Sequence, residues 1–423
     1  MQAEAQSSTH RRAYTLAVLV IVFTSSHVDR QIIGILAQPI KEAFALSDIE
    51  LGLLTGVSFA LFYATLGMPM AMWADRGNRR NIIALSISLW SAMTALCGLA
   101  QSYVQLLLAR IGVAVGEAGS NPPSHSIIAD LYAPEERATA MAIFATGVNL
   151  GIMVGYLIGG WVNEWLDWRW AFIIAGLPGL LIALVVRFTV TEPPRGLSEP
   201  DREVEKAPPF MTVVHTLWSR PVLRNTVIAN TLCSFAGYAT VAWVPTFFIR
   251  VHEMSSGEVG TMLAGLIGIG GAIGTFLGGW LADRLAPRSE GWRAWVVAIS
   301  ALIYVPFAWL CYTTESTTTA ILAFSVPAAF GGVYIGCSYA IIQSHTPVAM
   351  RSVAAAINLF ILNIVGLGLG PLLVGGVSDF YAADVGNQES LRYGMLAAVA
   401  VMFVTAGWYI HAGRLLHRTG SGV

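Results

Sequence analysis

Residues 71–80 read AMWADRGNRR, and residues 279–288 read GWLADRLAPR. Both stretches follow an apolar run, and their aspartates, Asp75 and Asp283, are 208 residues apart in a chain of 423. A second pair of similar stretches, PEERATA (134–140) and PVAMRSVAAA (347–356), has nearly the same separation. Self-similarity at about half the chain length indicates that the protein consists of two related halves.

The composition around these loops is that of a membrane protein. Hydrophobic residues make up 55% of the chain, charged residues make up 12%, and the mean hydropathy is +0.64. Soluble domains carry about 25% charged residues, and a helix needs about 20 apolar residues to cross a bilayer. Apolar runs of this length recur throughout, so we predict an all-α, multi-pass membrane protein. No polybasic stretch suggests binding to nucleic acid.

Hydropathy predicts twelve transmembrane helices, arranged as two pseudo-symmetric bundles of six. The stretch TEPPRGLSEPDREVEKAPPF (191–210), rich in proline and charge, separates the halves. We therefore assign an N-terminal bundle to residues 1–190, a linker to 191–221 and a C-terminal bundle to 222–423. The twelve spans are expected near 13–36, 50–73, 81–100, 103–128, 138–161, 169–190, 222–249, 258–282, 293–312, 319–344, 352–377 and 391–412.

The distribution of basic residues predicts the orientation in the membrane. Cytoplasmic loops are enriched in Lys and Arg, and 18 of the 24 basic residues lie on the side of the linker. We therefore expect both termini to be cytoplasmic. The remaining six basic residues are Lys41, Arg169, Arg250 and Arg392 on the other side, and Arg30 and Arg110 inside spans.

The repeated loops resemble the signature of the major facilitator superfamily, G-x-L-A-D-R-x-G-R-R. The second copy matches at Gly279, Leu281, Ala282, Asp283 and Arg284. The first copy matches at Ala74, Asp75, Arg76, Arg79 and Arg80, but has Ala71 and Asn78 at the two glycine positions. The resemblance covers the whole chain. It implies a secondary transporter that works by alternating access, with its substrate site near the bilayer midplane.

A narrower resemblance is to the spinster branch of this superfamily. The matching pieces are Asp29-Arg30, DRGNRR (75–80), RIGVAVGEA (110–118), IADLY (128–132), GIMVGYLIGG (151–160), WRWAF (168–172) and EPPRG (192–196). The branch implies lysophospholipids or sphingoid phosphates as substrates. The long tails of animal members are missing, which suits a bacterial chain in the inner membrane. Related transporters of organic anions share several of these pieces.

An acid–base pair, Asp29-Arg30, interrupts the first span. Charged side chains at the centre of a membrane helix cost about 2.5–3.5 kcal/mol each on insertion scales, and they usually have a function. At a rise of about 1.5 Å per residue, Asp29 and Arg110 reach comparable depths from opposite sides. The family resemblance places the first and fourth spans at the central cavity, so we expect an Asp29–Arg110 ion pair. A purely structural ion pair is the alternative.

Glu117 lies two helical turns beyond Arg110 on the same face of the fourth span. Because its pairing is less certain, Glu117 is the better candidate to bind the coupling proton, and Asp29 is the second. Arg110, together with Arg30, is the candidate to bind an anionic group of the substrate. Packing explains Arg30 equally well, since it points about 100° away from Asp29 around the helix.

The C-terminal spans contain no comparable charges. The candidate cavity-lining residues are His27 in the first span and Asn230, Phe235, Tyr238, Trp243, Tyr334, Ser338 and Tyr339 in the seventh and tenth. One charged wall and one aromatic wall favour an amphipathic anion. Each aromatic side chain by itself is equally consistent with ordinary helix packing.

Charged residues near the linker side are candidates for a cytoplasmic gate. Carboxylates at helix N-termini and arginines across a gap stabilise one closed state of two moving bundles. With the family resemblance, this assigns a gate to Asp75, Arg76, Arg80, Arg137, Asp283 and Arg284. A solvated surface position is an alternative for Arg79 and Arg80.

The sequence has no sign of cofactor chemistry. Its glycine-rich spans lack the Lys-Ser/Thr of a phosphate-binding loop, and no metal-ligand cluster or nucleophile–base pair stands out. We therefore predict a monomer without cofactor, metal or enzyme activity that couples protons to transport of an amphipathic anion. The alternatives are a transporter of small organic anions such as sugar acids, an efflux antiporter for drugs or lipids, and a receptor or membrane-embedded enzyme.

Overall fold

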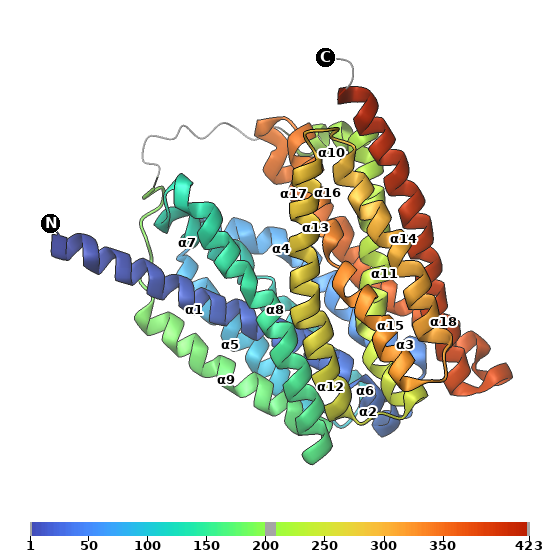
Figure 1. Ribbon diagram of the computed structural model, residues 1–423. Helices are drawn as coiled ribbons and strands as arrows, with labels where there is room; N and C mark the ends of the chain where they lie inside the picture. The colour runs from blue at the N-terminus through green and yellow to red at the C-terminus, as the bar shows by residue number, and fades with distance from the viewer. Residues whose placement is uncertain (1, 199–208, 421–423) are drawn as a thin grey trace. The chain divides into compact units, whose positions relative to one another are not determined.

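The computed structural model describes residues 2–198 and 209–420 and is helical almost throughout (Figure 1). The middle of the predicted linker, residues 199–208, lies outside the described residues. The N-terminal half contains α1 (Gln2–Ile35), α2 (Ala37–Phe44), α3 (Asp48–Gly52), η1 (Leu53–Val57), α4 (Ser58–Arg76), α5 (Arg79–Gly98), α6 (Tyr103–Glu117), α7 (Asn121–Leu131), α8 (Pro134–Trp165) and α9 (Trp168–Thr189).

The C-terminal half has a similar order of elements. It contains α10 (Phe210–Ser219), α11 (Pro221–His252), α12 (Ser256–Leu263), η2 (Ala264–Gly270), α13 (Gly271–Leu285), α14 (Trp292–Thr313), α15 (Thr317–Phe330), α16 (Val333–His345), η3 (Val348–Met350), α17 (Arg351–Ile361), η4 (Leu362–Leu369) and α18 (Gly370–Gly420). The halves also repeat their irregularities. The second span of each half contains a π-helix, η1 or η2, and the fourth is broken between α6 and α7 or between α15 and α16.

The predicted all-α fold with membrane-spanning helices is confirmed. Ten helices among the described residues are long and apolar enough to cross a membrane. One of them, Val348–Arg418, has 71 residues and contains a break at Gly386, where φ is 81°, so it supplies two spans. The fourth span is not among the ten because α6 and α7 have only 15 and 11 residues. Together these segments form the twelve transmembrane helices of a multi-pass integral membrane protein.

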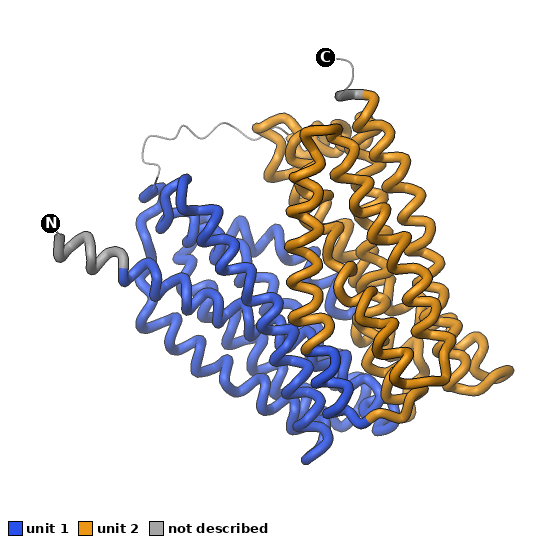
Figure 2. The backbone as a smooth tube through the Cα atoms, viewed as in Figure 1, with its two compact units in different colours: residues 1–44, 58–204, 255–264 blue, residues 45–57, 205–254, 265–423 orange. Residues whose placement is uncertain are grey.

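Backbone contacts divide the chain into two compact units (Figure 2). Unit 1 comprises residues 1–44, 58–204 and 255–264, and unit 2 comprises 45–57, 205–254 and 265–423. Each unit thus consists mainly of one half but includes a short segment from the other. The second span of each half changes unit at its π-helix, after Val57 in the first half and after Ala264 in the second.

Glycine allows the helices of unit 1 to pack closely. Along α8, glycines at 147, 151, 155 and 159 recur every fourth residue and therefore form a stripe on one face. A Cβ atom at Gly151 would lie 2.4 Å from His27 Cβ, and one at Gly159 would lie 2.3 Å from Ile35 Cγ2. Small residues on a helix face let two membrane helices approach each other, which brings α1 against α8.

Segments 45–57 and 255–264, which each belong to the unit formed mainly by the other half, are here called the exchanged segments. Both contain the same helix-start motif. Ser47 and Glu50 form a capping box at the start of α3, and Ser255 and Glu258 form one at the start of α12. This arrangement satisfies backbone N–H groups that would otherwise lack partners at a helix start. In each unit a further carboxylate accepts a hydrogen bond from the first turn.

The additional carboxylates come from helices of the unit that each segment joins. In unit 2, Asp379 accepts hydrogen bonds from the N–H groups of Asp48 at 2.9 Å and Ile49 at 2.7 Å. In unit 1, Glu164 accepts one from the N–H of Gly257 at 2.7 Å. A negative charge at a helix N-terminus is favourable because it complements the helix dipole.

A buried ion pair also fixes the exchanged segment of unit 2. The Nη1 and Nη2 atoms of Arg250 lie 2.7 and 2.9 Å from the two carboxylate oxygens of Asp48. The Ser378 hydroxyl donates to the same carboxylate at 2.6 Å. Both charged side chains are almost inaccessible, 6% exposed for Arg250 and 3% for Asp48. A bidentate geometry of this kind is the strongest form of an Arg–carboxylate contact.

Candidate functional site

Four ionisable residues meet inside unit 1. Helix α1 carries Asp29 and Arg30, and helix α6 carries Arg110 and Glu117. Asp29, Arg110 and Glu117 are buried, with exposures of 0%, 2% and 1%. The Arg30 side chain retains 19% of its exposure. The structure thus places these four candidate residues of the first and fourth spans in one cluster.

The ion pair of the cluster joins Arg30 to Glu117. The Nε atom of Arg30 lies 2.6 Å from Glu117 Oε2. The Nη1 atom of Arg110 instead donates to the main-chain carbonyl of Asp29 at 3.1 Å. The predicted Asp29–Arg110 ion pair is therefore replaced by a different pairing. The helix rise gave the correct depth, but depth alone does not determine which of two adjacent side chains points toward α6.

Several polar atoms of this cluster have no hydrogen-bond partner among the described residues. They are both carboxylate oxygens of Asp29, Oε1 of Glu117 and Nε of Arg110. Burial of a charged or polar atom without a partner costs free energy. Protonation of a buried carboxylate lowers this cost.

Two aromatic residues of α4, neither of them a candidate from the sequence, complete the cluster. The Cζ atom of Arg30 lies 4.3 Å from the centroid of the Tyr63 ring and 5.0 Å from that of Phe59. The Cζ atom of Arg110 lies 5.3 Å from the Phe59 centroid. Their four-residue spacing in SFALFY places both rings on one face of a helix, which the sequence indicates. The second span carries no charge in this region, so that spacing alone did not predict a site.

His27 has a different environment from the four ionisable residues. Its Nδ1 atom lies 2.9 Å from the Phe23 carbonyl oxygen, within the same helix. Its ring packs edge-on against the Phe23 ring, with centroids 4.6 Å apart. The Cβ contact with Gly151 places His27 at the interface of α1 and α8.

Unit 2 contains the seven other candidate lining residues, and three of them are engaged in buried hydrogen bonds. Asn230 donates to the Asn358 side chain at 3.1 Å, and the Trp243 indole donates to the Pro371 carbonyl at 2.8 Å. The hydroxyl of Ser338 lies 2.7 Å from that of Tyr409. Of the other four candidates, Tyr334 is buried, with an exposure of 8%. Phe235, Tyr238 and Tyr339 are partly buried.

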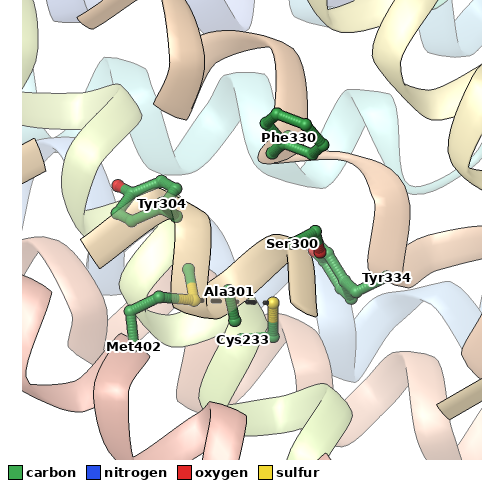
Figure 3. Close-up of a pocket in the computed structure, with 7 residues that line it drawn as sticks. All are labelled: Cys233, Ser300, Ala301, Tyr304, Phe330, Tyr334 and Met402. Carbon is green, nitrogen blue, oxygen red and sulfur yellow. Dashed lines mark hydrogen bonds between the residues drawn. The ribbon is translucent and has the colours of Figure 1, made fainter. Parts of the chain in front are cut away.

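A small pocket lies within unit 2 (Figure 3). Its lining consists of hydroxyl, sulfur-containing and apolar groups. The sulfur atoms of Cys233 and Met402 lie 4.0 Å apart, and a dashed line in Figure 3 joins them. Tyr334 is the one candidate lining residue at this pocket. The complete lining is Cys233, Ser300, Ala301, Tyr304, Phe330, Tyr334 and Met402.

The gate candidates of unit 1 do not form one cluster. Asp75 and Arg76 are exposed at the end of α4. The Nη1 atom of Arg80 donates to the Val190 carbonyl at 3.4 Å, and Arg137 donates to the Ser198 hydroxyl at 3.1 Å. Both contacts tie the loop after α9 to unit 1.

For Arg79, the sequence left a solvated surface position open as an alternative. Arg79 is 1% exposed, so a solvated surface position is wrong for this residue. Its guanidinium forms ion pairs with Asp130 and, at 2.7 Å, with Glu192, and it donates to the Pro193 carbonyl at 2.8 Å. Arg79 thus connects the start of α5 to the end of α7 and to the EPPRG stretch.

The gate candidates of unit 2 are both exposed. Asp283 lies 3.5 Å from Arg293 Nη2, and the Cζ atom of Arg284 lies 5.3 Å from the centroid of the Trp280 ring. Within residues 2–198 and 209–420, no group of three or more His, Cys, Asp or Glu side chains is placed to hold a metal ion.

Two repeated sets of apolar helices around buried ionisable groups define the class of secondary membrane transporters. The profile of the Major Facilitator Superfamily matches residues 19–371, and the chain belongs to this superfamily.

Three known proteins illustrate the similarity. A bacterial homologue of the human lysosomal transporter spinster, in an inward-facing and unoccupied conformation, has 33% sequence identity and a TM-score of 0.87, covering 96% of this chain and 98% of that one. An MFS-type efflux pump of Mycolicibacterium smegmatis is 34% identical over 404 residues, covering 94% of this chain and 92% of the pump. The D-galactonate transporter of Escherichia coli is 26% identical over 421 residues, covering 93% of this chain and 94% of that transporter. The predicted family and its spinster resemblance are confirmed.

Proposed function

We propose that this protein is a proton-coupled secondary transporter of an amphipathic anion, such as a lysophospholipid or a sphingoid phosphate. The observation that carries the proposal is the ion pair between Arg30 and the buried Glu117. Arg30 is the only partly exposed member of the four-residue cluster, so a ligand reaches its guanidinium more readily than that of Arg110.

The coupling step follows from the charges of this pair. A proton on Glu117 neutralises the carboxylate and removes the counter-ion of Arg30. The guanidinium of Arg30, with that of Arg110, is then free to bind an anionic head group, because Arg presents several donors in a geometry that matches phosphate. Loss of the proton restores the ion pair and releases the anion. Asp29, which is fully buried, is the second proton acceptor in the proposal.

The asymmetry of the two units supports an amphipathic substrate. The ionisable cluster belongs to unit 1, whereas the candidate lining residues of unit 2 are amide, hydroxyl and aromatic. These are the two kinds of group that a charged head and an apolar tail require. The similarity to a spinster homologue adds to this support.

Uptake into proteoliposomes tests the proposal. Labelled lysophosphatidylglycerol should accumulate in a protein-dependent manner when a pH gradient is imposed, and Glu117→Gln should abolish the effect of the gradient. Glu136→Gln, which alters an exposed ion pair, is the matched control and should transport normally. Gradient-driven accumulation retained by Glu117→Gln would refute the coupling role of Glu117, and the same test applies to Asp29→Asn.

A small organic anion is the second candidate substrate. The similarity to a D-galactonate transporter favours it, and the same two arginines would bind a carboxylate. Accumulation of labelled galactonate but not of the lysophospholipid would establish this alternative. Transport of the substrate out of the cell would instead support efflux, the activity in the name of the mycobacterial relative.

Localisation and gating complete the proposal. The excess of basic residues on the linker side supports cytoplasmic termini in a bacterial inner membrane. The exposed Asp75, Arg76, Asp283 and Arg284, with Arg80 and Arg137, are proposed as a gate on that side. A C-terminal fluorescent fusion should be bright and a C-terminal phosphatase fusion inactive, and the reverse pattern would refute the orientation.

A further inference from the structure

The mechanism above leaves the two aromatic residues of α4 without a role. Phe59 is 1% exposed, and its ring lies beside two guanidinium groups, with Cζ distances of 5.0 Å for Arg30 and 5.3 Å for Arg110. A cation within about 6 Å of an aromatic centroid is attracted by the negative face of the ring. One buried ring therefore lies close to both cations of the cluster.

Tyr63 extends this surface toward the more exposed arginine. Its ring centroid is 5.4 Å from that of Phe59, and the two planes differ by 21°. The Arg30 Cζ atom is only 4.3 Å from the Tyr63 centroid. Residues four apart lie on the same face of a helix, so the two rings form one continuous aromatic surface, here called the aromatic ledge.

A π-helix directly precedes α4. The element η1 (Leu53–Val57) ends one residue before α4 begins and two residues before Phe59. A π-turn adds a residue to the helical repeat and rotates everything that follows, and such turns are frequent at functional sites. In the same element, a Cβ atom at Gly56 would lie 2.6 Å from the Gly368 carbonyl oxygen, so close backbone packing fixes the turn.

We infer that Phe59 and Tyr63 are positioning residues that hold the Arg30 guanidinium beside Glu117 and keep it in place when Glu117 takes up a proton. This inference rests on the proposed function of the same cluster. Arg30 lies between a carboxylate 2.6 Å away and a ring centroid 4.3 Å away. After protonation the carboxylate no longer attracts it, but the ring still does. The anion then meets a cation that is already oriented.

The ledge has two measurable consequences. First, a guanidinium fixed next to Glu117 stabilises the ionised carboxylate, so loosening Arg30 should favour protonation and move the midpoint of proton binding to higher pH. Second, preorganisation lowers the cost of binding, so loosening Arg30 should weaken anion binding. The charged and titratable groups that face the cluster are His27, Asp29 and Arg30 from α1, Tyr63 from α4, Cys97 from α5, and Arg110 and Glu117 from α6.

Tyr63 offers the cleanest pair of variants because it is only partly buried. Tyr63→Phe keeps the ring and removes the hydroxyl, whereas Tyr63→Leu removes the ring. Infrared difference spectroscopy of the purified protein follows the carbonyl band of a protonated carboxylic acid as a function of pH, and Glu117→Gln identifies the band of Glu117. This titration requires no substrate.

We expect Tyr63→Leu to raise the midpoint of the Glu117 band by about 0.5–1 pH unit, a three- to tenfold change in proton affinity. Tyr63→Phe loses only the interaction of the hydroxyl with Arg30 and should shift the midpoint by less than half as much. Phe59→Leu should behave like Tyr63→Leu if it folds, and the Tyr63 pair decides the question if it does not. An unchanged or lower midpoint in Tyr63→Leu overturns the inference.

Binding of lysophosphatidylglycerol separates this inference from the proposed function. The affinity should fall about tenfold in Tyr63→Leu and remain within twofold in Tyr63→Phe. If the unaltered protein binds no lysophospholipid, the proposed substrate is refuted, but the infrared titration still decides the role of the aromatic ledge. Equal affinities of Tyr63→Leu and Tyr63→Phe would contradict the positioning of Arg30.

Discussion

Replacing Arg250 with glutamine tests how strongly the exchanged segment 45–57 is held in unit 2. The substitution leaves the Asp48 carboxylate, 3% exposed, without its bidentate partner. Removal of one member of a buried ion pair costs about 3–5 kcal/mol, since the other charge stays buried and uncompensated. The Ser378 hydroxyl still donates to this carboxylate, and Asp379 still accepts from the Asp48 N–H, but neither contact supplies a positive charge.

The corresponding change in melting temperature follows from the size of the unit. For a unit of 150–250 residues, 1 kcal/mol shifts the Tm by about 2–4 °C, so Arg250→Gln should lower it by roughly 6–20 °C. Thermal unfolding of the purified protein in detergent measures the shift. Arg12→Gln is the matched control, because Arg12 and Glu136 form a similar two-pronged contact, at 2.6 and 3.3 Å, that is solvent-exposed. Its loss should cost at most about 1 kcal/mol.

A double-mutant cycle separates the ion pair from other effects of the substitution. Asp48→Asn combined with Arg250→Gln removes both charges, so the double variant should be more stable than the sum of the single effects predicts, by about 1–3 kcal/mol. If Arg250→Gln is no more destabilising than Arg12→Gln, the reasoning from burial is refuted. Additive single effects would show that the two charges are not coupled.

Three further predictions concern packing, the Arg79 contacts and pH. Gly160→Ala should destabilise unit 1 by about 1–3 kcal/mol, because the added Cβ would clash with a backbone oxygen. Gly279→Ala is the control: its Cβ would have no atom within 4 Å, so it should be neutral or slightly stabilising in the same melting assay. Equal effects of the two substitutions would contradict this account of the packing. Arg79→Lys keeps the charge but loses the planar fork that reaches two carboxylates and a carbonyl, so it should cost about 2 kcal/mol, and a Tm within 1 °C of the unaltered protein would count against this. Burial and the nearby Arg392 lower the pKa of His252 below its ordinary value, so the unfolded chain binds a proton that the folded protein does not, and stability falls as pH drops through about 6.5. His252→Gln should therefore lose less Tm between pH 7.5 and pH 5, by on the order of 1 °C, whereas an equal or greater loss would exclude this contribution.

The sequence predicted the fold because a bilayer leaves few alternatives. Apolar runs of about 20 residues must be helices there, since no other single-chain segment satisfies its own backbone hydrogen bonds. The repeated Ala-Asp-Arg loops then divided the spans into two sets of six. Asp29, Arg30, Arg110 and Glu117 were predictable as site candidates because ionisable residues inside spans are rare.

The pairing within the cluster could not be predicted in the same way. Helix rise gives depth, but the rotation of each helix depends on packing against its neighbours, here on the glycine stripe of α8 that contacts α1. Arg30 rather than Asp29 reaches the facing carboxylate. Phe59 and Tyr63 were missed for a related reason. The π-turn η1 changes the helical register before them, and periodicity arguments assume a regular helix.

Hydropathy also did not predict that segments 45–57 and 255–264 belong to the unit of the other half. The sequence does contain the helix-start motif of each segment. Serine followed three residues later by glutamate, at Ser47 and Glu50 and again at Ser255 and Glu258, is a helix-start pattern that sequence alone reveals. What it does not reveal is which carboxylate elsewhere in the chain accepts the remaining N–H groups. That information is long-range, and Asp379 and Glu164 supply it.

The exchange of segments also imposes an order on biosynthesis. Glu164 is followed by its partner Gly257 after only 93 residues, so unit 1 has all of its chain long before translation ends. Asp48, in contrast, must wait 331 residues for Asp379. At about 5–20 residues per second, this interval lasts on the order of 20 s to 1 min. During that time the backbone N–H groups of Asp48 and Ile49 await the carboxylate that accepts from them in the folded protein, so segment 45–57 completes its contacts with unit 2 only after Asp379 has been synthesised.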